Sequence, residues 1–223
     1  MTDEPLTPAL SPPPRKGEGE APLDDESARR VLVSKDLSAG VKWSREWAMP
    51  SADTFDIPHI AGFVKKHLMQ CKVSIDPFAR NKRWATYTND LNPATAAEYH
   101  MDAVAFMEML VREGVKADLI IIDPPYSPRQ ISECYQSAGL KAGMKDTQSA
   151  VLYQRVKNAA AKLATKDAIV LSFGWNSVGL GKDRGFEISE IMLVCHGGAH
   201  NDTICMSETK RTENQTQLWQ HER

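Results

Sequence analysis

Long hydrophobic runs, paired cysteines and an excess of one charge are all absent from this chain. No run of about 18 apolar residues occurs, so no membrane-spanning helix is expected. The first residues are acidic and proline-rich and lack the apolar core of a secretory signal, so an exported protein is not expected. Four cysteines lie scattered without paired spacing, and we interpret them as reduced thiols of a cytoplasmic protein. They are Cys71, Cys134, Cys195 and Cys205.

The formal net charge is only −2. Residues 1–30 hold four Lys/Arg and seven Asp/Glu, so the remaining residues carry 23 against 22. A body this close to neutral lacks the broad basic surface that nucleic-acid-binding proteins present to phosphates. Local basic patches remain at residues 80–83 and at Lys182 with Arg184. Charge alone therefore neither requires nor excludes a nucleic-acid partner.

Length and composition predict a single folded domain. The 223 residues suffice for one sizeable core and are too few for two. Residues 1–27 contain six of the 13 prolines and few aromatic or β-branched residues, which is typical of a disordered tail. We predict a tail over residues 1–30, one domain over residues 31–215 and a short tail over residues 216–223.

Strand-like and helix-like patterns alternate along the predicted domain. This alternation predicts an α/β fold with a doubly wound, mostly parallel sheet, and the last two strands are expected to form an antiparallel terminal hairpin. The expected helices cover residues 55–68, 99–110 and 147–164. The expected strands cover residues 72–75, 85–88, 117–122, 167–173, 187–194 and 202–206.

The most informative stretch is Asp123-Pro124-Pro125-Tyr126, which directly follows the apolar residues 119–122. The apolar run predicts a strand buried on both faces, and the two prolines end it abruptly. Ligands of open α/β sheets bind at this carboxyl edge. A carboxylate and free carbonyls can hold an exocyclic amino group, and a tyrosine ring can stack on a planar base. This chemistry suits the alkylation of a nucleobase amine.

The motif resembles the catalytic motif of the S-adenosylmethionine-dependent DNA amino-methyltransferases. Aspartate in its first position resembles the adenine-N6 branch more than the cytosine-N4 branch, which often carries serine. The resemblance implies a class I, Rossmann-like methyltransferase fold whose last strand is antiparallel, with DNA as the partner, in a small prokaryotic or phage-like member. Asp123, Pro124, Pro125 and Tyr126 are the expected catalytic residues.

The same resemblance assigns cofactor-binding residues upstream of the catalytic strand. Asp76-Pro77-Phe78-Ala79 resembles the start of the cofactor motif, and Asn89-Asp90 resembles the acidic motif that reaches the ribose hydroxyls. Asp102 resembles the residue that meets the adenine amino group of S-adenosylmethionine. A helix cap or a turn is the alternative role for each single aspartate.

Two segments depart from the family's pattern. Arg80-Asn81-Lys82 replaces Gly-Ser-Gly, where glycines normally allow a tight turn close to the cofactor. A separate target-recognition segment of many tens of residues is missing, and the polar stretch of residues 127–146 is the longest alternative. We expect this stretch to be a loop that borders the nucleic acid, with a solvent-exposed loop as the other interpretation.

The expected reaction is methyl transfer to the N6 amino group of adenine in DNA after base flipping. Asp123 and the carbonyl of Pro124 would accept the amino hydrogens, and Tyr126 would stack on the base. The alternatives are an RNA or cytosine-N4 methyltransferase, or a nonenzymatic nucleic-acid-binding relative with a degenerate cofactor site. No metal is expected, since the Cys and His residues between 195 and 205 fit no standard zinc spacing. Trp175 is either a core residue or part of the base pocket.

Overall fold

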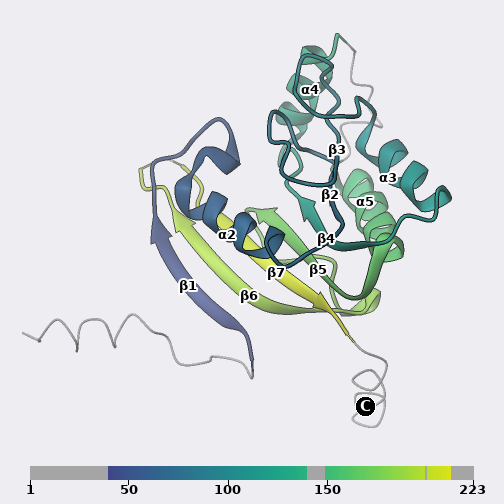
Figure 1. Cartoon of the computed structure of the whole chain (residues 1–223). Helices are drawn as coiled ribbons and strands as arrows, with labels where there is room; N and C mark the ends of the chain where they lie inside the picture. Colours follow the sequence, from purple (N-terminus) through teal and green to yellow (C-terminus); the bar gives the residue numbers. More distant parts are fainter. Residues whose placement is uncertain (1–39, 140–148, 199, 212–223) are drawn as a thin grey trace, which may run out of the picture. The chain divides into compact units, whose positions relative to one another are not determined.

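The computed structural model describes residues 40–139, 149–198 and 200–211, so both predicted tails lie outside the described residues. Seven strands form one sheet in the order β1-β6-β7-β5-β4-β2-β3 (Figure 1). These strands are β1 (Lys42–Trp47), β2 (Ser74–Asp76), β3 (Tyr87–Thr88), β4 (Ala117–Ile122), β5 (Ala164–Gly174), β6 (Phe186–Cys195) and β7 (Thr203–Lys210).

Strand directions confirm the predicted mostly parallel sheet. β7 runs antiparallel to both β5 and β6, whereas all other neighbouring strands are parallel. An antiparallel last strand in an otherwise parallel, helix-covered sheet is the class I methyltransferase arrangement expected from the sequence. The predicted hairpin of β6 and β7 is present, but it is not terminal in the sheet. β7 lies between β5 and β6, and β1 lies outside β6.

Strand β1 was not predicted. Its sequence, Lys-Trp-Ser-Arg-Glu-Trp, lacks the alternation of apolar and polar residues that marks a half-buried strand. The strand pairs with β6 along its whole length but occupies the sheet edge, where Trp43 and Trp47 remain 45% and 62% exposed. Edge strands need little burial, so backbone pairing with β6 rather than hydrophobic pattern determines this element.

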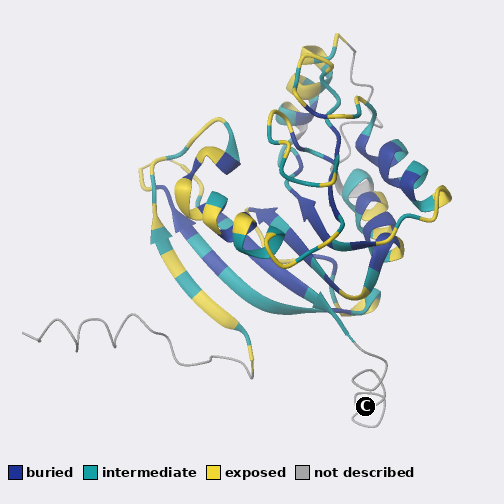
Figure 2. Cartoon of the chain, in the orientation of Figure 1, coloured by how far each residue is buried: buried dark blue, intermediate teal, exposed yellow. Residues whose placement is uncertain are grey.

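Helices cover both faces of the sheet, as Figures 1 and 2 show. Along β4, Leu119 and Ile121 pack with α2, and Ile120 and Ile122 pack with α3 and α5. This alternation explains why the predicted strand is apolar at every position from 119 to 122. Within the described residues, no helix is long and apolar enough to cross a membrane. The helices are η1 (Thr54–Asp56), α2 (Pro58–Leu68), α3 (Ala103–Arg112), α4 (Pro128–Ser137), α5 (Ser149–Leu163) and η2 (Lys182–Arg184).

Helix α4 corrects the expectation of a loop over residues 127–146. Its first turn forms a capping box, in which the Ser127 hydroxyl accepts from the Gln130 backbone N–H and the Gln130 side chain accepts from the Ser127 N–H. This pairing satisfies two donors that a helix start leaves unpaired. Residues 140–148 are outside the described residues.

Candidate active site

The carboxyl ends of β2, β3 and β4 lie side by side at one edge of the sheet, where a cavity of about 530 Å³ opens. This volume lies within the usual range for small-molecule sites. Its walls include four predicted catalytic residues and two predicted cofactor residues, together with residues from the start of η1 and from α4. The lining residues are Ala52, Thr54, Phe78, Arg80, Asn81, Asp90, Asn92, Ala94, Thr95, Asp123, Pro124, Pro125, Tyr126, Gln130, Glu133, Cys134 and Ser137.

The predicted catalytic motif is held mainly by contacts within its own neighbourhood. The Tyr126 hydroxyl donates to Oδ1 of Asp123, and the Tyr126 backbone N–H donates to Oε1 of Gln130 at 2.7 Å. The Tyr153 hydroxyl on α5 donates to the carbonyl of Pro125 at 2.5 Å. Gly174 at the end of β5 leaves room for the tyrosine ring, because a Cβ there would stand 3.2 Å from Cε1 of Tyr126.

Burial dominates the acid–base behaviour of this motif. It raises the pKa of Asp123 from 3.8 to about 6, although hydrogen bonds from Tyr126 and Thr54 and the charge of Arg80 oppose the rise. Burial and the neighbouring Asp123 carboxylate raise the pKa of Tyr126 well above its ordinary value. Near neutral pH the motif therefore presents a carboxylate beside a neutral phenol.

The loop after β2 keeps the cavity open despite its lack of glycine. Arg80 takes a φ of 49°, the left-handed conformation that glycine normally provides. Its backbone N–H donates to Oδ2 of Asp90 at 3.2 Å, and its guanidinium donates to the carbonyl of Ala52 at 2.6 Å. Asn81 accepts a hydrogen bond from the Ala96 N–H at 3.0 Å. The substitution of Gly-Ser-Gly therefore does not close the site.

Asp90 and Phe78 line the cavity, but the other predicted cofactor residues shape the loops around it. Asp76 is 2% exposed and accepts from the Phe78 N–H at 3.0 Å, and burial raises its pKa well above the ordinary value. Asn89 is fully buried, and its amide donates to the carbonyls of Pro77 and Met101 at 3.1 and 3.0 Å. Both of its N–H groups are thereby used within the protein.

Asp102 and Ala79 also lie outside the cavity lining. Asp102 caps α3, since its Oδ1 accepts from the N–H groups of Val104 and Ala105 at 3.0 and 3.1 Å. Ala79 is 1% exposed, and its N–H donates to the carbonyl of Asn89 at 2.9 Å. The cap role, which the sequence left open for Asp102, is the one that the geometry shows.

A second cavity, of about 320 Å³, adjoins the first at Tyr126. The two cavities share Ala52, Thr54, Tyr126 and Gln130. Trp175 lines the second cavity, is 47% exposed and lies 5.5 Å from Tyr126 between ring centroids, at an interplanar angle of 45°. Trp175 therefore belongs to this pocket and not to the core. The remaining lining residues are Pro50, Ser51, Ile57, His196, His200, Asn201 and Thr203.

The sequence motifs did not predict that residues 50–57 belong to the site, although this segment contributes Ala52 and Thr54 to both cavities. It precedes α2 in the chain and does not adjoin any predicted strand end. The one available signal was Asp53-Thr54 before a helical pattern, which is typical of a helix cap and carries no indication of a site. Only the folded chain brings this segment to Asp123.

Cys195 and His196 form side-chain hydrogen bonds with other protein groups. His196 pairs through Nδ1 with the carbonyl of Ala48 and through Nε2 with the Thr203 hydroxyl, both at 2.9 Å. The Cys195 thiol accepts from Nε of Arg45 at 3.1 Å. Among residues 40–139, 149–198 and 200–211, no three His, Cys, Asp or Glu side chains are grouped as a metal site would require.

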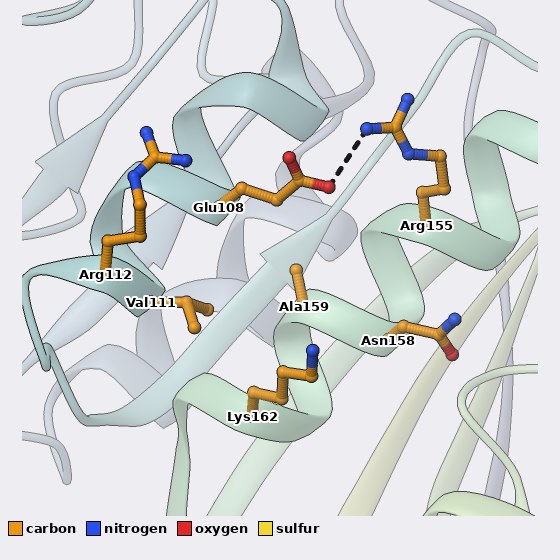
Figure 3. Close-up of a pocket in the computed structure, with 7 residues that line it drawn as sticks. All are labelled: Glu108, Val111, Arg112, Arg155, Asn158, Ala159 and Lys162. Carbon is orange, nitrogen blue, oxygen red and sulfur yellow. Dashed lines mark hydrogen bonds and ion pairs between the residues drawn. The ribbon is translucent and has the colours of Figure 1, made fainter.

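A separate hollow of about 350 Å³ lies between α3 and α5 (Figure 3). Glu108 and Arg155 form an ion pair across it, with 3.0 Å between Oε1 and Nη2. Arg112 and Lys162 add positive charge to the same hollow. None of the predicted catalytic or cofactor residues lines it, so we place the candidate active site at the carboxyl edge of the sheet.

No protein-family profile and no curated protein matches the chain. The solved structures similar to it include SMU.776, "a putative methyltransferase complexed with SAH", and "a putative sam-dependent methyltransferase from Streptococcus mutans". They share 13% and 14% sequence identity with it, at TM-scores of 0.46 and 0.42. Each match covers 66% of this chain and 48% of the other, so this chain spans about half of those proteins. At such TM-scores the likeness does not indicate a function.

Proposed function

We propose that this chain transfers a methyl group from S-adenosylmethionine to the exocyclic amino group of a nucleobase, with N6 of adenine in DNA as the leading substrate. The observation that carries the proposal is the pair of cavities that share Tyr126 in their walls, with Asp123 in the wall of the larger one. A cofactor and an acceptor need two such adjoining volumes, so that reacting atoms meet without diffusing apart.

The larger cavity fits the cofactor. Asp90 accepts backbone hydrogen bonds from Asn92 and Arg80, and its carboxylate retains further lone pairs for hydroxyl donors of a ribose. Phe78 supplies an apolar wall, and the left-handed Arg80 keeps its side chain bonded to Ala52. When bound, S-adenosylmethionine supplies an activated methyl group on a sulfonium. These features argue against the alternative of a nonenzymatic relative with a degenerate cofactor site.

The smaller cavity fits the acceptor base. Tyr126 and Trp175 offer ring faces on which a planar heterocycle can stack. Asp123 and Pro124 line the larger cavity, so the amino group would reach them where the two cavities meet and would donate to the Asp123 carboxylate and the Pro124 carbonyl. These bonds would orient the nitrogen lone pair toward the sulfonium methyl, whose C–S bond breaks to release S-adenosylhomocysteine while the surplus amine proton passes to water. Catalysis is then positioning together with electrostatic stabilisation of a nitrogen that gains positive charge. Because the base must leave its stack to reach the cavity, base flipping is part of the proposal.

Binding of S-adenosylhomocysteine tests the cofactor half of the proposal. Isothermal titration calorimetry of the full chain is expected to show one site of micromolar to submillimolar affinity. No heat of binding at millimolar ligand would overturn the proposed function and restore the nonenzymatic alternative.

Product analysis tests the acceptor half. The protein is incubated with labelled S-adenosylmethionine and either unmethylated genomic DNA or total RNA, and the digested nucleosides are separated chromatographically. Label on N6-methyldeoxyadenosine supports the proposal. Label on N4-methylcytosine, or on RNA alone, would replace it with one of the alternative acceptors.

A further inference from the structure

Thr54 lies at the point where the two cavities meet, although no motif of the chain includes it. It lines both cavities, beside Tyr126 in each of them and beside Asp123 in the larger one. Its neighbour Phe55 is 4% exposed and packs edge-on against Phe173 at 5.1 Å between ring centroids. The backbone at Thr54 is therefore anchored in the core while its side chain faces the site.

The loop that departs from the glycine pattern fastens the chain on both sides of Thr54. Arg80 donates to the carbonyl of Ala52 at 2.6 Å, two residues before Thr54. Lys82 pairs with Asp56 at 2.5 Å, two residues after it. Two of the three residues that replace Gly-Ser-Gly thus use their side chains to hold the segment that presents Thr54.

The electrostatic surroundings of Asp123 give the Thr54 hydroxyl a defined task. Burial and the neighbouring acidic groups of Asp53 and Asp76 disfavour the charged form of Asp123, and the hydrogen bond from Tyr126 opposes them only in part. A hydroxyl donor stabilises the carboxylate and restricts its rotation, which leaves the remaining lone pairs directed at the substrate. The titratable groups that interact with Asp123 are Asp53, Asp76, Arg80, Tyr126, Tyr153 and Cys205.

We infer that Thr54 is a positioning residue of the amine site, whose hydroxyl donates to Asp123 and keeps this carboxylate charged and turned toward the acceptor nitrogen. The inference rests on the proposed function, because an amine acceptor is what the oriented carboxylate serves. It extends that function to a residue outside the catalytic tetrapeptide, and it gives the Arg80-Asn81-Lys82 loop a structural role.

The test follows the ionisation of Asp123 directly, without any substrate. In the full chain labelled with [4-¹³C]aspartate, the Asp123 carboxyl resonance is identified by its loss in Asp123→Asn and titrated by NMR. The wild-type midpoint is expected at about 6. Thr54→Val keeps the side-chain shape but removes the donor, and it is expected to raise the midpoint by about 1 in pH, a tenfold change in the ionisation constant.

Two variants control for unrelated changes. Thr54→Ser retains the hydroxyl and is expected to keep the wild-type midpoint, so it separates the hydroxyl from the packing of the methyl group. Thr95→Val changes another threonine of the larger cavity, whose hydroxyl donates to the carbonyl of Asn92 at 2.9 Å. It is expected to leave the Asp123 midpoint unchanged.

An unchanged midpoint in Thr54→Val would overturn the inference, whatever the protein binds. Calorimetry with S-adenosylhomocysteine separates this failure from a failure of the proposed function. If Thr54→Val raises the midpoint and binds the ligand within about threefold of wild type, both ideas are supported. If the midpoint rises but wild-type protein binds no ligand, the Thr54–Asp123 pairing stands and its role in methyl transfer is refuted.

Discussion

The segment of residues 123–126 after β4 and the loop of residues 76–82 after β2 border the same cavity, but different contacts hold them. In the first, Asp123, Tyr126 and Gln130 bond to one another within eight residues. In the second, Arg80 and Lys82 bond to residues 28 and 26 positions away. The segment of residues 123–126 is therefore largely shaped by its own sequence, whereas the loop of residues 76–82 depends on chain segments that only folding brings near.

The largest effect on activity is expected from Asp123→Asn, in the segment of residues 123–126. The amide keeps the side-chain shape but loses the charge that stabilises the developing positive charge on the acceptor nitrogen. Methyl transfer, measured as label incorporated into DNA, should fall about 10²- to 10³-fold. Glu133→Gln is the matched control, since Glu133 lines the same cavity but pairs with Arg129, and its activity should change less than about threefold. Equal loss in both variants would contradict the assigned role.

The same substitution should stabilise the fold at alkaline pH. The folded-state pKa of Asp123, about 6, lies above the ordinary 3.8, so the native state binds more protons and stability falls as pH rises between these values. Removing the charge should recover up to about 3 kcal/mol of unfolding free energy at pH 8 and little below pH 4. Urea denaturation at both pH values checks this, and a variant less stable than wild type at pH 8 would refute it.

Tyr126→Ala is expected to have the next largest effect. Loss of the ring removes a stacking surface worth about 1–3 kcal/mol per base and the hydroxyl that donates to Asp123, so activity should fall about 10- to 100-fold. Tyr126→Phe keeps the ring and removes only the donor. It should retain most of the activity at pH 8 and show a raised Asp123 midpoint, measured by the NMR titration described above. Indistinguishable activity of the two variants would argue against stacking.

The pH dependence of kcat/KM tests which form of Asp123 is active. Accepting hydrogen bonds from an amine requires the carboxylate, and burial raises the pKa of this group to about 6. The value of kcat/KM should therefore fall about tenfold for each pH unit below 6 and stay constant above it. A flat profile between pH 5 and 8, or a rate that rises toward acid, would be incompatible with an accepting carboxylate.

The smallest effect is expected in the loop of residues 76–82, which contacts between distant residues hold. Urea denaturation compares the stability of two Arg80 variants. Both Arg80→Gly and Arg80→Ala lose the hydrogen bond to the Ala52 carbonyl, but only glycine relieves the left-handed backbone. The glycine variant should be more stable than the alanine variant by about 1 kcal/mol. At ordinary backbone angles an alanine variant is usually more stable than a glycine variant. If the alanine variant is the more stable one here, the backbone at Arg80 is not strained.

Much of the fold could be predicted because its strands are buried. The apolar run in β4 and the helical periodicities of α2, α3 and α5 arise from packing on both faces of the sheet. Strand β1 and helix α4 could not be predicted in this way. The first has little buried surface, and the second begins at a capping box whose hydrogen bonds outweigh a polar composition.

The chain's own sequence determines the placement of Asp123 to Tyr126, because a buried strand ended by two prolines leaves a carboxylate and a ring at the carboxyl edge whatever surrounds them. Only the tertiary structure decides that Asn89 supports the loops around the cavity, that Arg80 stands in for a glycine, and that Thr54 lines the same cavity as Asp123. These roles rest on contacts between residues that are distant in the chain. A contact between residues far apart in the chain leaves no pattern in the local sequence. Such contacts form only when the sheet has assembled.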